Sequence, residues 1–293
     1  MADITTDNLF DPLVWGDLAQ AEFTGNAIVA GSTAVMEANT LQGRPGSTIR
    51  FPKWTALGDM ADIAETAAIE PETLTQEASE AVIKEAAKGV EYTDKADLVG
   101  LGDIETEAVR QFGVLSARKV DADLITAAQA VITGGIKDVK GTAVRDSKPY
   151  QHTITGGAIT WPGIVDALEK FGDEFEPTDF TGLFIRAEQR SQIMKDDTFI
   201  RASELNAGGG QGSQVRRGFI GEVAGLPVYI TNRLATGKGL ILKKGSLGLL
   251  YKRRPLVERD RDILKRTNVV TINLHYAVKR LVDKGVLDLT IGA

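Results

Sequence analysis

The side chains that most often carry out catalysis are scarce in this chain. It has no cysteine and two histidines, His152 and His275. Without cysteine, the chain can form no disulfide, thiolate nucleophile or thiolate metal site. Neither histidine has a second histidine or a carboxylate at the spacing of a metal-ligand set. We therefore predict no catalytic, metal-ligating or cofactor-binding residue, no cofactor, and a protein that is not an enzyme.

The glycine-rich segment 204–218 is the nearest approach to a phosphate-binding loop. A P-loop places a lysine and then a serine or threonine after its last glycine, where they reach the phosphates and the metal. Here Gly212 is followed by Ser213 and Gln214. The segment also lies between a helical and a strand-like stretch, which reverses the required strand–loop–helix order. We expect a surface loop at these residues.

Charge is the more informative chemistry, because it is distributed unevenly along the chain. No basic residue occurs between Lys53 and Lys84, whereas basic residues dominate residues 238–266. Two interpretations stay open: two ordinary solvated faces, where exposed ion pairs contribute only ~0–1 kcal/mol each, or complementary surfaces that join neighbouring copies. The acidic residues of such a contact are Asp59, Asp62, Glu65, Glu70, Glu72 and Glu77. The basic residues are Lys252, Arg253, Arg254, Arg259 and Arg261.

Composition limits the classes of partner. The 293 residues are 43% hydrophobic and 25% charged, which allows a packed core in a chain of ordinary globular composition. The formal net charge of −6 argues against a protein that grips nucleic acid with its whole surface. The N-terminus lacks the pattern of a secretory signal, and no apolar run approaches the ~20 residues of a membrane span. We expect no membrane partner.

A protruding hairpin is predicted in the first third of the chain. The segments 48–54 and 88–98 are strand-like, and Pro52 places the first of them at a sheet edge. The residues between them are too acidic and too rich in alanine to form a core of their own. They are expected to form a long polar tip.

A long helix is predicted over residues 103–133. Apolar residues recur there at steps of three and four. Asp103, Glu105 and Glu107 fall in the first turn, where acidic groups favour the positive end of the helix dipole. The pair Gly134–Gly135 is expected to end the helix. At 1.5 Å per residue its length would be roughly 45 Å, which suits a beam that spans the molecule.

The second half of the chain mixes short helices with strands. Thr160 and Pro162 predict the start of a helix, as N-cap and first-turn residues. A strand is expected over 182–185. Strict alternation of apolar and polar residues over 270–279 predicts a half-buried strand, and 286–291 is the last strand. The fold class is α+β.

This order of elements resembles the major capsid proteins of tailed bacteriophages with the Hong Kong 97-like fold. Three segments carry the local resemblance: the strand pair at Gly221–Val228, VERDRD at Val257–Asp262, and the strands of Val270–Ile291. The stretch beginning GAITWPGIVDALEKF is also similar to the helix–strand–helix of the family's central domain. The resemblance covers nearly the whole chain in order.

The resemblance implies a division of the chain into four parts. The expected parts are an N-terminal arm at 1–43, an extended loop at 44–96, a peripheral domain with the spine helix (about 103–133) at 97–155 and 246–283, and an axial domain at 156–245 and 284–293.

The resemblance also implies a function. It is that of a major capsid protein, which self-assembles into pentamers and hexamers of an icosahedral shell around a double-stranded DNA genome. The implied partners are many copies of itself, a portal, DNA bound without sequence specificity on the inner face, and a separate scaffolding protein, because the arm is too short for a fused one. The location would be the virion, after assembly in the host cytoplasm.

Two alternatives stay open. One is an encapsulin-like protein compartment, which shares the fold but encloses cargo rather than a genome. The more distant one is a soluble α+β enzyme that uses carboxylates in residues 160–245. Some family members crosslink their shells through an isopeptide bond from a lysine on the extended loop. Because no lysine lies between Lys53 and Lys84, we expect a shell without this crosslink at the loop tip.

Overall fold

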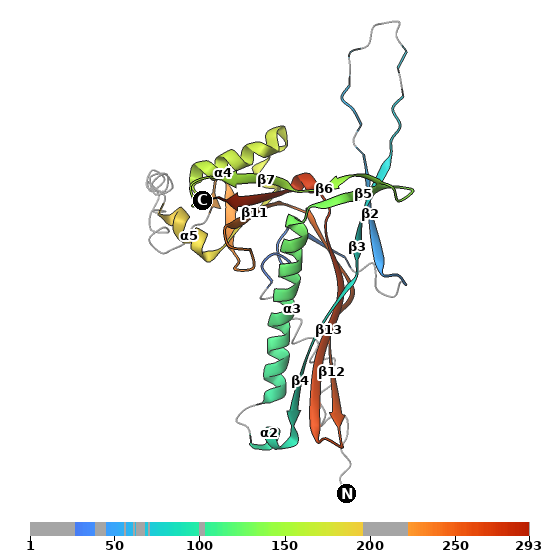
Figure 1. Ribbon diagram of the computed structural model, residues 1–293, viewed down its shortest axis with the longest axis vertical. Helices are drawn as coiled ribbons and strands as arrows, with labels where there is room; N and C mark the ends of the chain where they lie inside the picture. The colour runs from blue at the N-terminus through green and yellow to red at the C-terminus, as the bar shows by residue number, and fades with distance from the viewer. Residues whose placement is uncertain are drawn as a thin grey trace.

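The structure is a computed structural model that describes residues 27–38, 45–55, 57–60, 62, 68–69, 71–99, 103–195 and 222–292. It combines helices with three sheets, so the predicted α+β fold is confirmed. Figure 1 shows an elongated molecule. A hairpin projects at one end, a body with the C-terminus lies to the side, and a long helix follows long strands to the opposite end.

A four-stranded sheet forms the length of the molecule. Its strands, in spatial order, are β1 (Val35–Ala38), β12 (Leu247–Asp262), β13 (Thr267–Arg280) and β4 (Lys84–Thr93). β1 is parallel to β12, and the other neighbours are antiparallel. Val270, Ile272, Leu274 and Tyr276 of β13 are buried. The alternation predicted for this strand is therefore confirmed, and the strand is longer than expected.

Helix α3 (Ile104–Gln129) packs along this sheet, preceded by the short helix α2 (Asp94–Val99). Asp103 is its N-cap and accepts hydrogen bonds from the backbone N–H groups of Glu105 and Thr106 at 3.0 and 3.1 Å. The start of the predicted helix is confirmed.

The predicted end of the helix at residue 133 is wrong. The helix stops at Gln129, because Ala130 is extended and the β-branched residues that follow enter strand β5 (Ile132–Asp138). The glycine pair lies inside this strand. Gly134 has φ +60°, and a Cβ built there would lie 2.9 Å from the Cβ of Ala143. A close strand contact, not a helix stop, requires this glycine.

A second four-stranded sheet carries the hairpin. Its order is β2 (Thr48–Trp54), β3 (Gln76–Val82), β5 and β6 (Ala143–Ser147), all antiparallel. The first arm of the predicted hairpin is confirmed, but the prediction of the second arm at 88–98 is wrong. β3 is the second arm, whereas β4 pairs with β13 over ten residues.

The lateral body contains a six-stranded sheet. Its strands in spatial order are β7 (Tyr150–Ile154), β14 (Val286–Ile291), β11 (Lys238–Lys243), β8 (Phe180–Ile185), β10 (Leu226–Ile230) and β9 (Glu222–Val223). The helical elements are α4 (Trp161–Leu168), α5 (Ala187–Met194) and short 3₁₀ turns at Glu169–Glu174, Pro177–Asp179 and Asp283–Gly285. Thr160 caps α4 and Pro162 lies in its first turn, as predicted.

Three apolar clusters hold these layers together. One lies beneath α4 and on the six-stranded sheet, around Phe171 and Leu183. Another joins the first half of α3, around Phe112, to the long strands. The largest joins the second half of α3 to the long four-stranded sheet and to the six-stranded sheet, through residues such as Leu124, Leu240 and Tyr276. This junction fixes the body relative to the long sheet.

Candidate interaction surfaces

The two histidines lie in strands and are partly exposed. His152 is half-buried in β7. His275 is half-buried in β13, with Nε2 3.5 Å from a carboxylate oxygen of Glu85. Both side chains remain partly exposed, on strands that pair with β14 and with β4. Among the described residues, no group of three histidine or acidic side chains could hold a metal ion.

The acidic residues of the hairpin follow two patterns. Asp59, Asp62 and Glu72 are exposed on the projecting tip. Glu72 accepts a hydrogen bond from the backbone N–H of Gly58 at 3.0 Å, which ties the two sides of the tip together. Glu77 lies at the base instead and is partly buried. Two further residues of the predicted set, Glu65 and Glu70, lie outside the described residues, as does the predicted glycine-rich loop.

Apolar side chains are also exposed on this hairpin. Met60 is fully exposed and Ile69 is 78% exposed, while Trp54 and Leu57 are more than half exposed. Exposed apolar groups gathered on one projection are typical of a surface that another protein covers. Met60 and Ile69 stand within the same acidic run, whose charges alone do not predict an apolar surface.

The basic residues of β12 have partners within the chain. Arg254 lies 2.7 Å from Glu37 of the N-terminal strand β1. Lys252 donates to the backbone carbonyl of Gly46 at 2.7 Å. Arg253 donates to the side-chain oxygen of Asn273 on the neighbouring strand. The basic stretch therefore attaches β12 to segments that precede the hairpin.

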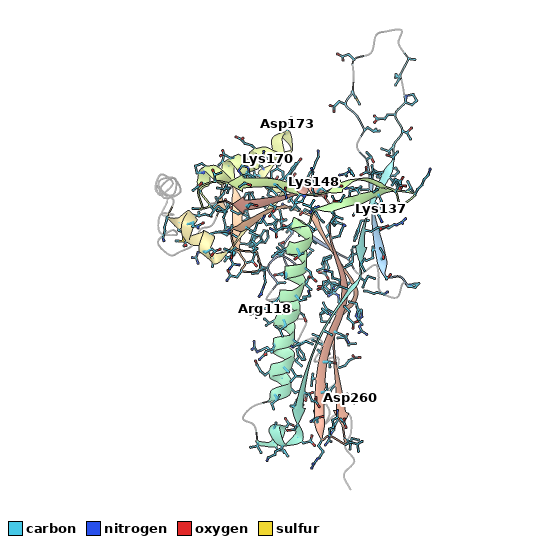
Figure 2. The ribbon with its side chains drawn as sticks, viewed as in Figure 1. Arg118, Lys137, Lys148, Lys170, Asp173 and Asp260 are labelled. Carbon is cyan, nitrogen blue, oxygen red and sulfur yellow. The ribbon has the colours of Figure 1, made fainter. Side chains whose placement is uncertain are left out.

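The distal half of β12 shows the same arrangement. Arg259 lies 3.3 Å from Glu105 at the start of α3, and Arg261 lies 2.8 Å from Asp94 of α2. Asp260, between them, marks this end of the molecule in Figure 2. Both arginine side chains remain more than half exposed. Since a guanidinium has five N–H donors, each can still donate to another acceptor.

A buried arginine closes the end of α3. The side chain of Arg280, at the end of β13, is 2% exposed. Its Nη1 donates to the carbonyl oxygens of Ala128 and Ala130 at 2.6 and 2.8 Å, and its Nη2 donates to Oγ of Ser147 at 2.9 Å. These carbonyls belong to the last helical turn, which lacks intrahelical donors. A cation at this end also favours the helix dipole.

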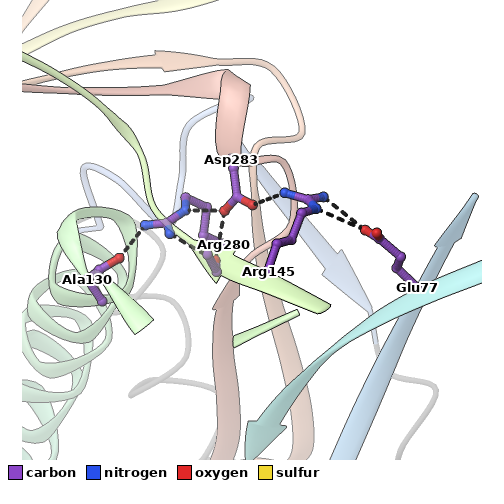
Figure 3. Close-up of polar contacts among 6 residues, drawn as sticks. Glu77, Ala130, Arg145, Arg280 and Asp283 are labelled. Atoms are coloured by element: carbon purple, nitrogen blue, oxygen red, sulfur yellow. Dashed lines mark hydrogen bonds and ion pairs between the residues drawn. The ribbon is translucent and has the colours of Figure 1, made fainter. Parts of the chain in front are cut away.

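The same arginine connects α3 to the base of the hairpin (Figure 3). Asp283 accepts from Nε of Arg280 at 2.9 Å and lies 3.4 Å from Arg145 of β6. Arg145 in turn lies 3.0 Å from Glu77 of β3. Lys53 of β2 is also close, and burial, together with the charge of Arg145, lowers its pKa. No local pattern predicts this chain of contacts, because most of its members are distant from one another along the sequence.

A buried carboxylate anchors the N-terminal segment. Asp121 of α3 accepts from the backbone N–H groups of Ile28 and Ala30 at 2.8 and 2.9 Å. Val29, between them, is fully buried. Burial raises the pKa of Asp121, while the backbone hydrogen bonds oppose that rise. The sequence offered one clue, since Asp121 stands beside Val120 on the apolar face of the predicted helix.

No helix in the described ranges is long and apolar enough to cross a bilayer.

Comparison with known proteins gives consistent matches. The chain matches the model of a family described as phage capsid protein over residues 76–287. It is 30% identical to the major capsid protein of Staphylococcus phage phiMR11 over 291 residues, which cover 98% of this chain and 96% of that protein. The capsid of cyanophage Pam1 aligns with a TM-score of 0.68 at 16% identity, over 100% of this chain and 96% of that one. The capsid of cyanophage P-SCSP1u gives 0.67 at 16% identity, over 91% and 89%. The fold is that of tailed-phage capsids, the Hong Kong 97-like fold.

Proposed function

Because the chain belongs to the phage capsid protein family, we propose that its projecting hairpin and its strand β12 are surfaces through which copies join. The chain is a major capsid protein, and many copies of it form the shell of a phage particle. The shape of the subunit carries the proposal. The hairpin extends beyond the body and exposes apolar and acidic side chains there.

The finer architecture is part of the proposal. Copies would form pentamers and hexamers that close into an icosahedral shell around double-stranded DNA, since identical contacts repeated by rotation give closed assemblies. DNA would be held on the inner face without sequence specificity. A portal and a separate scaffolding protein would take part, and assembly would occur in the host cytoplasm. The relatives above give no support to an encapsulin-like compartment or a soluble enzyme.

The role is structural, and we propose that it requires neither catalysis nor a cofactor. His152 and His275 are both part of strand pairing, and each is half-buried. The hairpin has no lysine between Lys53 and Lys84. The tip therefore cannot supply the amine of an isopeptide bond, and denaturing gels of purified particles should show no ladder of linked subunits.

The division into parts follows the order of elements. The proposed arm is 1–43, the extended loop 44–96, the peripheral domain 97–155 and 246–283, and the axial domain 156–245 and 284–293. Two strands lie within one proposed part but pair with strands of another. β4 pairs with β13 of the proposed peripheral domain, and β7 belongs to the six-stranded sheet of the proposed axial domain. The part of the loop free to reach a neighbour is then the β2–β3 hairpin.

Charge would fix the register of the contact between copies. The proposed acidic side is Asp59, Asp62, Glu65, Glu70, Glu72 and Glu77. The proposed basic side is Lys252, Arg253, Arg254, Arg259 and Arg261. The arginines that already hold α2, α3 and β1 keep exposed donors for these carboxylates. Apolar burial would supply most of the affinity, over an interface in the obligate class of more than ~2,000 Å².

Electron microscopy of the largest fraction from expression, with any scaffold supplied, tests the shell. Closed particles of uniform size are expected. A small discrete oligomer under every condition would contradict the proposal.

The charge contact has its own test. Replacing Arg253, Arg254 and Arg259 with Glu should impair assembly, while the circular dichroism of the subunit stays unchanged. Lys170→Glu, on the lateral body in Figure 2, is the control and should assemble normally. Normal shells from the triple variant would remove the charge contact from the proposal.

A further inference from the structure

A small cavity lies where the end of α3, the turn from β3 to β4 and the end of β13 meet. Its volume is about 200 Å³. Its wall is mostly apolar and includes Ala127 and Val278, and the exposed side chain of Val82 lies at its rim. Binding sites for whole small molecules usually have ~300–1,000 Å³. This cavity is the size of one protein side chain.

Lys279 lies at this cavity and is 7% exposed. Lysine is almost never so buried unless its charge is paired. Within the described residues, however, its ammonium has no hydrogen-bond or ion-pair partner. Burial and the nearby charge of Arg280 lower the pKa of Lys279, although Asp283 and Glu80 act in the opposite direction. The side chain is therefore largely buried, and its ammonium, which is not among the fully buried atoms without a partner, keeps contact with solvent at the cavity.

The other charged groups around the cavity are already engaged. Arg280 is bonded to Asp283 and to the end of α3. Lys84 lies 3.7 Å from Asp123. The cavity's one carboxylate among the described lining residues, Glu80, lies 2.6 Å from Lys137 and 2.9 Å from Arg50. Lys84 and Arg280 thus have carboxylate partners within the chain, and Glu80 is already paired with two other cations, so none of these carboxylates is left for Lys279.

We propose that this cavity receives one Asp or Glu side chain of a second copy of the chain, whose carboxylate pairs with Lys279. The inference rests on the proposed function, in which copies contact each other. The apolar wall fits the methylene stem of such a side chain, and the ammonium fits its head. Acidic residues outnumber basic ones, 40 to 34, and the hairpin that carries many of them points away from its own body. A neighbour is thus the natural source of the carboxylate.

Zero-length crosslinking tests the pairing in the intact particle. Shells are assembled from a mixture of ¹⁴N- and ¹⁵N-labelled subunits and treated with a carbodiimide, which joins an amine directly to a carboxylate. Mass spectrometry of the digest should find Lys279 linked to an acidic peptide with mixed labels. Lys279 left unlinked, or linked only within one copy, in shells whose other lysines are linked between copies would overturn the inference. If no shells form, the proposed function fails and this inference with it.

A charge-removing variant gives a second, independent readout. Lys279→Met keeps the length of the side chain and removes the ammonium. The isolated subunit should unfold at an equal or higher urea concentration than the wild type, because an unpaired buried charge has been removed. The shells should come apart at a lower temperature. Lys148→Met, an exposed lysine on the turn between β6 and β7 (Figure 2), should change neither value. A parallel loss of subunit and shell stability would mean a purely structural role and would overturn the pairing.

Discussion

Asp123 of α3 keeps its charge inside the subunit because donors surround it. The hydroxyl of Tyr276 donates to one carboxylate oxygen at 2.6 Å, and Lys119 donates to the other at 3.1 Å. Burial alone would raise the pKa of this carboxyl, but the two hydrogen bonds and the charge of Lys84 outweigh it, so the pKa is lowered. The ionised form therefore joins the helix to strand β13.

This pairing gives the subunit a pH-dependent stability. Since the pKa of Asp123 is lower in the folded state, its contribution is present above the unfolded value of about 3.9 and is lost as the pH falls through the folded value. Tyr276→Phe should reduce the free energy of unfolding at neutral pH by about 1.5–3 kcal/mol, the contribution of a hydrogen bond to a charged group. The difference in the free energy of unfolding between the variant and the wild type should become smaller in acid. Urea unfolding at neutral pH and at a pH below the pKa of Asp123 measures it. A difference that stays constant down to about pH 2 would contradict this explanation.

Residue-level prediction from the sequence succeeded where the signal was local. Asp103 was identified as part of the helix start because a cap acts on the next three residues. Asp121 and Arg280 were not identified, because their partners lie in distant segments. An aspartate beside apolar helix positions indicates a buried polar contact but does not reveal the partner.

At the scale of elements, the end of α3 depends on a side chain from another strand. The backbone carbonyls of Ala128 and Ala130 accept hydrogen bonds from Arg280, and an ion pair with Asp283 holds the Arg280 side chain in place. The residues that follow have a high propensity for β-strand. The helix therefore ends before Gly134–Gly135, the pair predicted to end it. The same contacts continue to Glu77, so the helix end and the hairpin base are fixed together (Figure 3).

Arg280→Met should therefore destabilise the subunit strongly. It leaves the carbonyls of Ala128 and Ala130 without their side-chain donor and removes the buried ion pair with Asp283, which keeps Arg145 and Ser147 as partners. Breaking a buried ion pair typically costs about 3–5 kcal/mol. The control is Arg110→Met, which removes an exposed pair with Glu107 on the same helix and should cost less than about 1 kcal/mol. Denaturant unfolding of the two variants measures the difference. Equal losses would show that Arg280 does not hold the helix end.

The hairpin shows why strand partners are harder to predict than strands. β3 has the sequence QEASEAV, and glutamate and alanine are depleted in strands. It becomes a strand through pairs across the sheet, including Arg50 with Glu80 at 2.9 Å and Lys137 with Glu80 at 2.6 Å. Cross-strand pairs of this kind stabilise a sheet that propensity alone would not form. Strand β13, by contrast, could be predicted from the sequence, because its buried face places an apolar residue at every second position.

At the scale of the whole molecule, the subunit leaves apolar side chains exposed at both of its ends. The hairpin projects from one end, and α2 with the β12–β13 turn lies at the other (Figure 1). Leu98 and Leu264 are strongly exposed at that far end, as Met60 and Ile69 are on the hairpin. The order of elements along the sequence allowed this elongated fold to be predicted. The apolar surfaces could not be predicted, because only the structure shows which apolar residues remain outside the core.

The relative weight of apolar and charged contacts on the hairpin can be measured. Burying a methionine or isoleucine side chain contributes about 1.5–3 kcal/mol, whereas an exposed ion pair contributes ~0–1 kcal/mol. The double variant Met60→Ser with Ile69→Ser should therefore lower the yield of shells more than Asp59→Asn with Asp62→Asn. Both should leave subunit stability unchanged, because these side chains are exposed. Sedimentation of assembly reactions at equal protein concentration compares the yields. If the charge variant is the more defective, electrostatic pairing rather than apolar burial holds the hairpin to its neighbour.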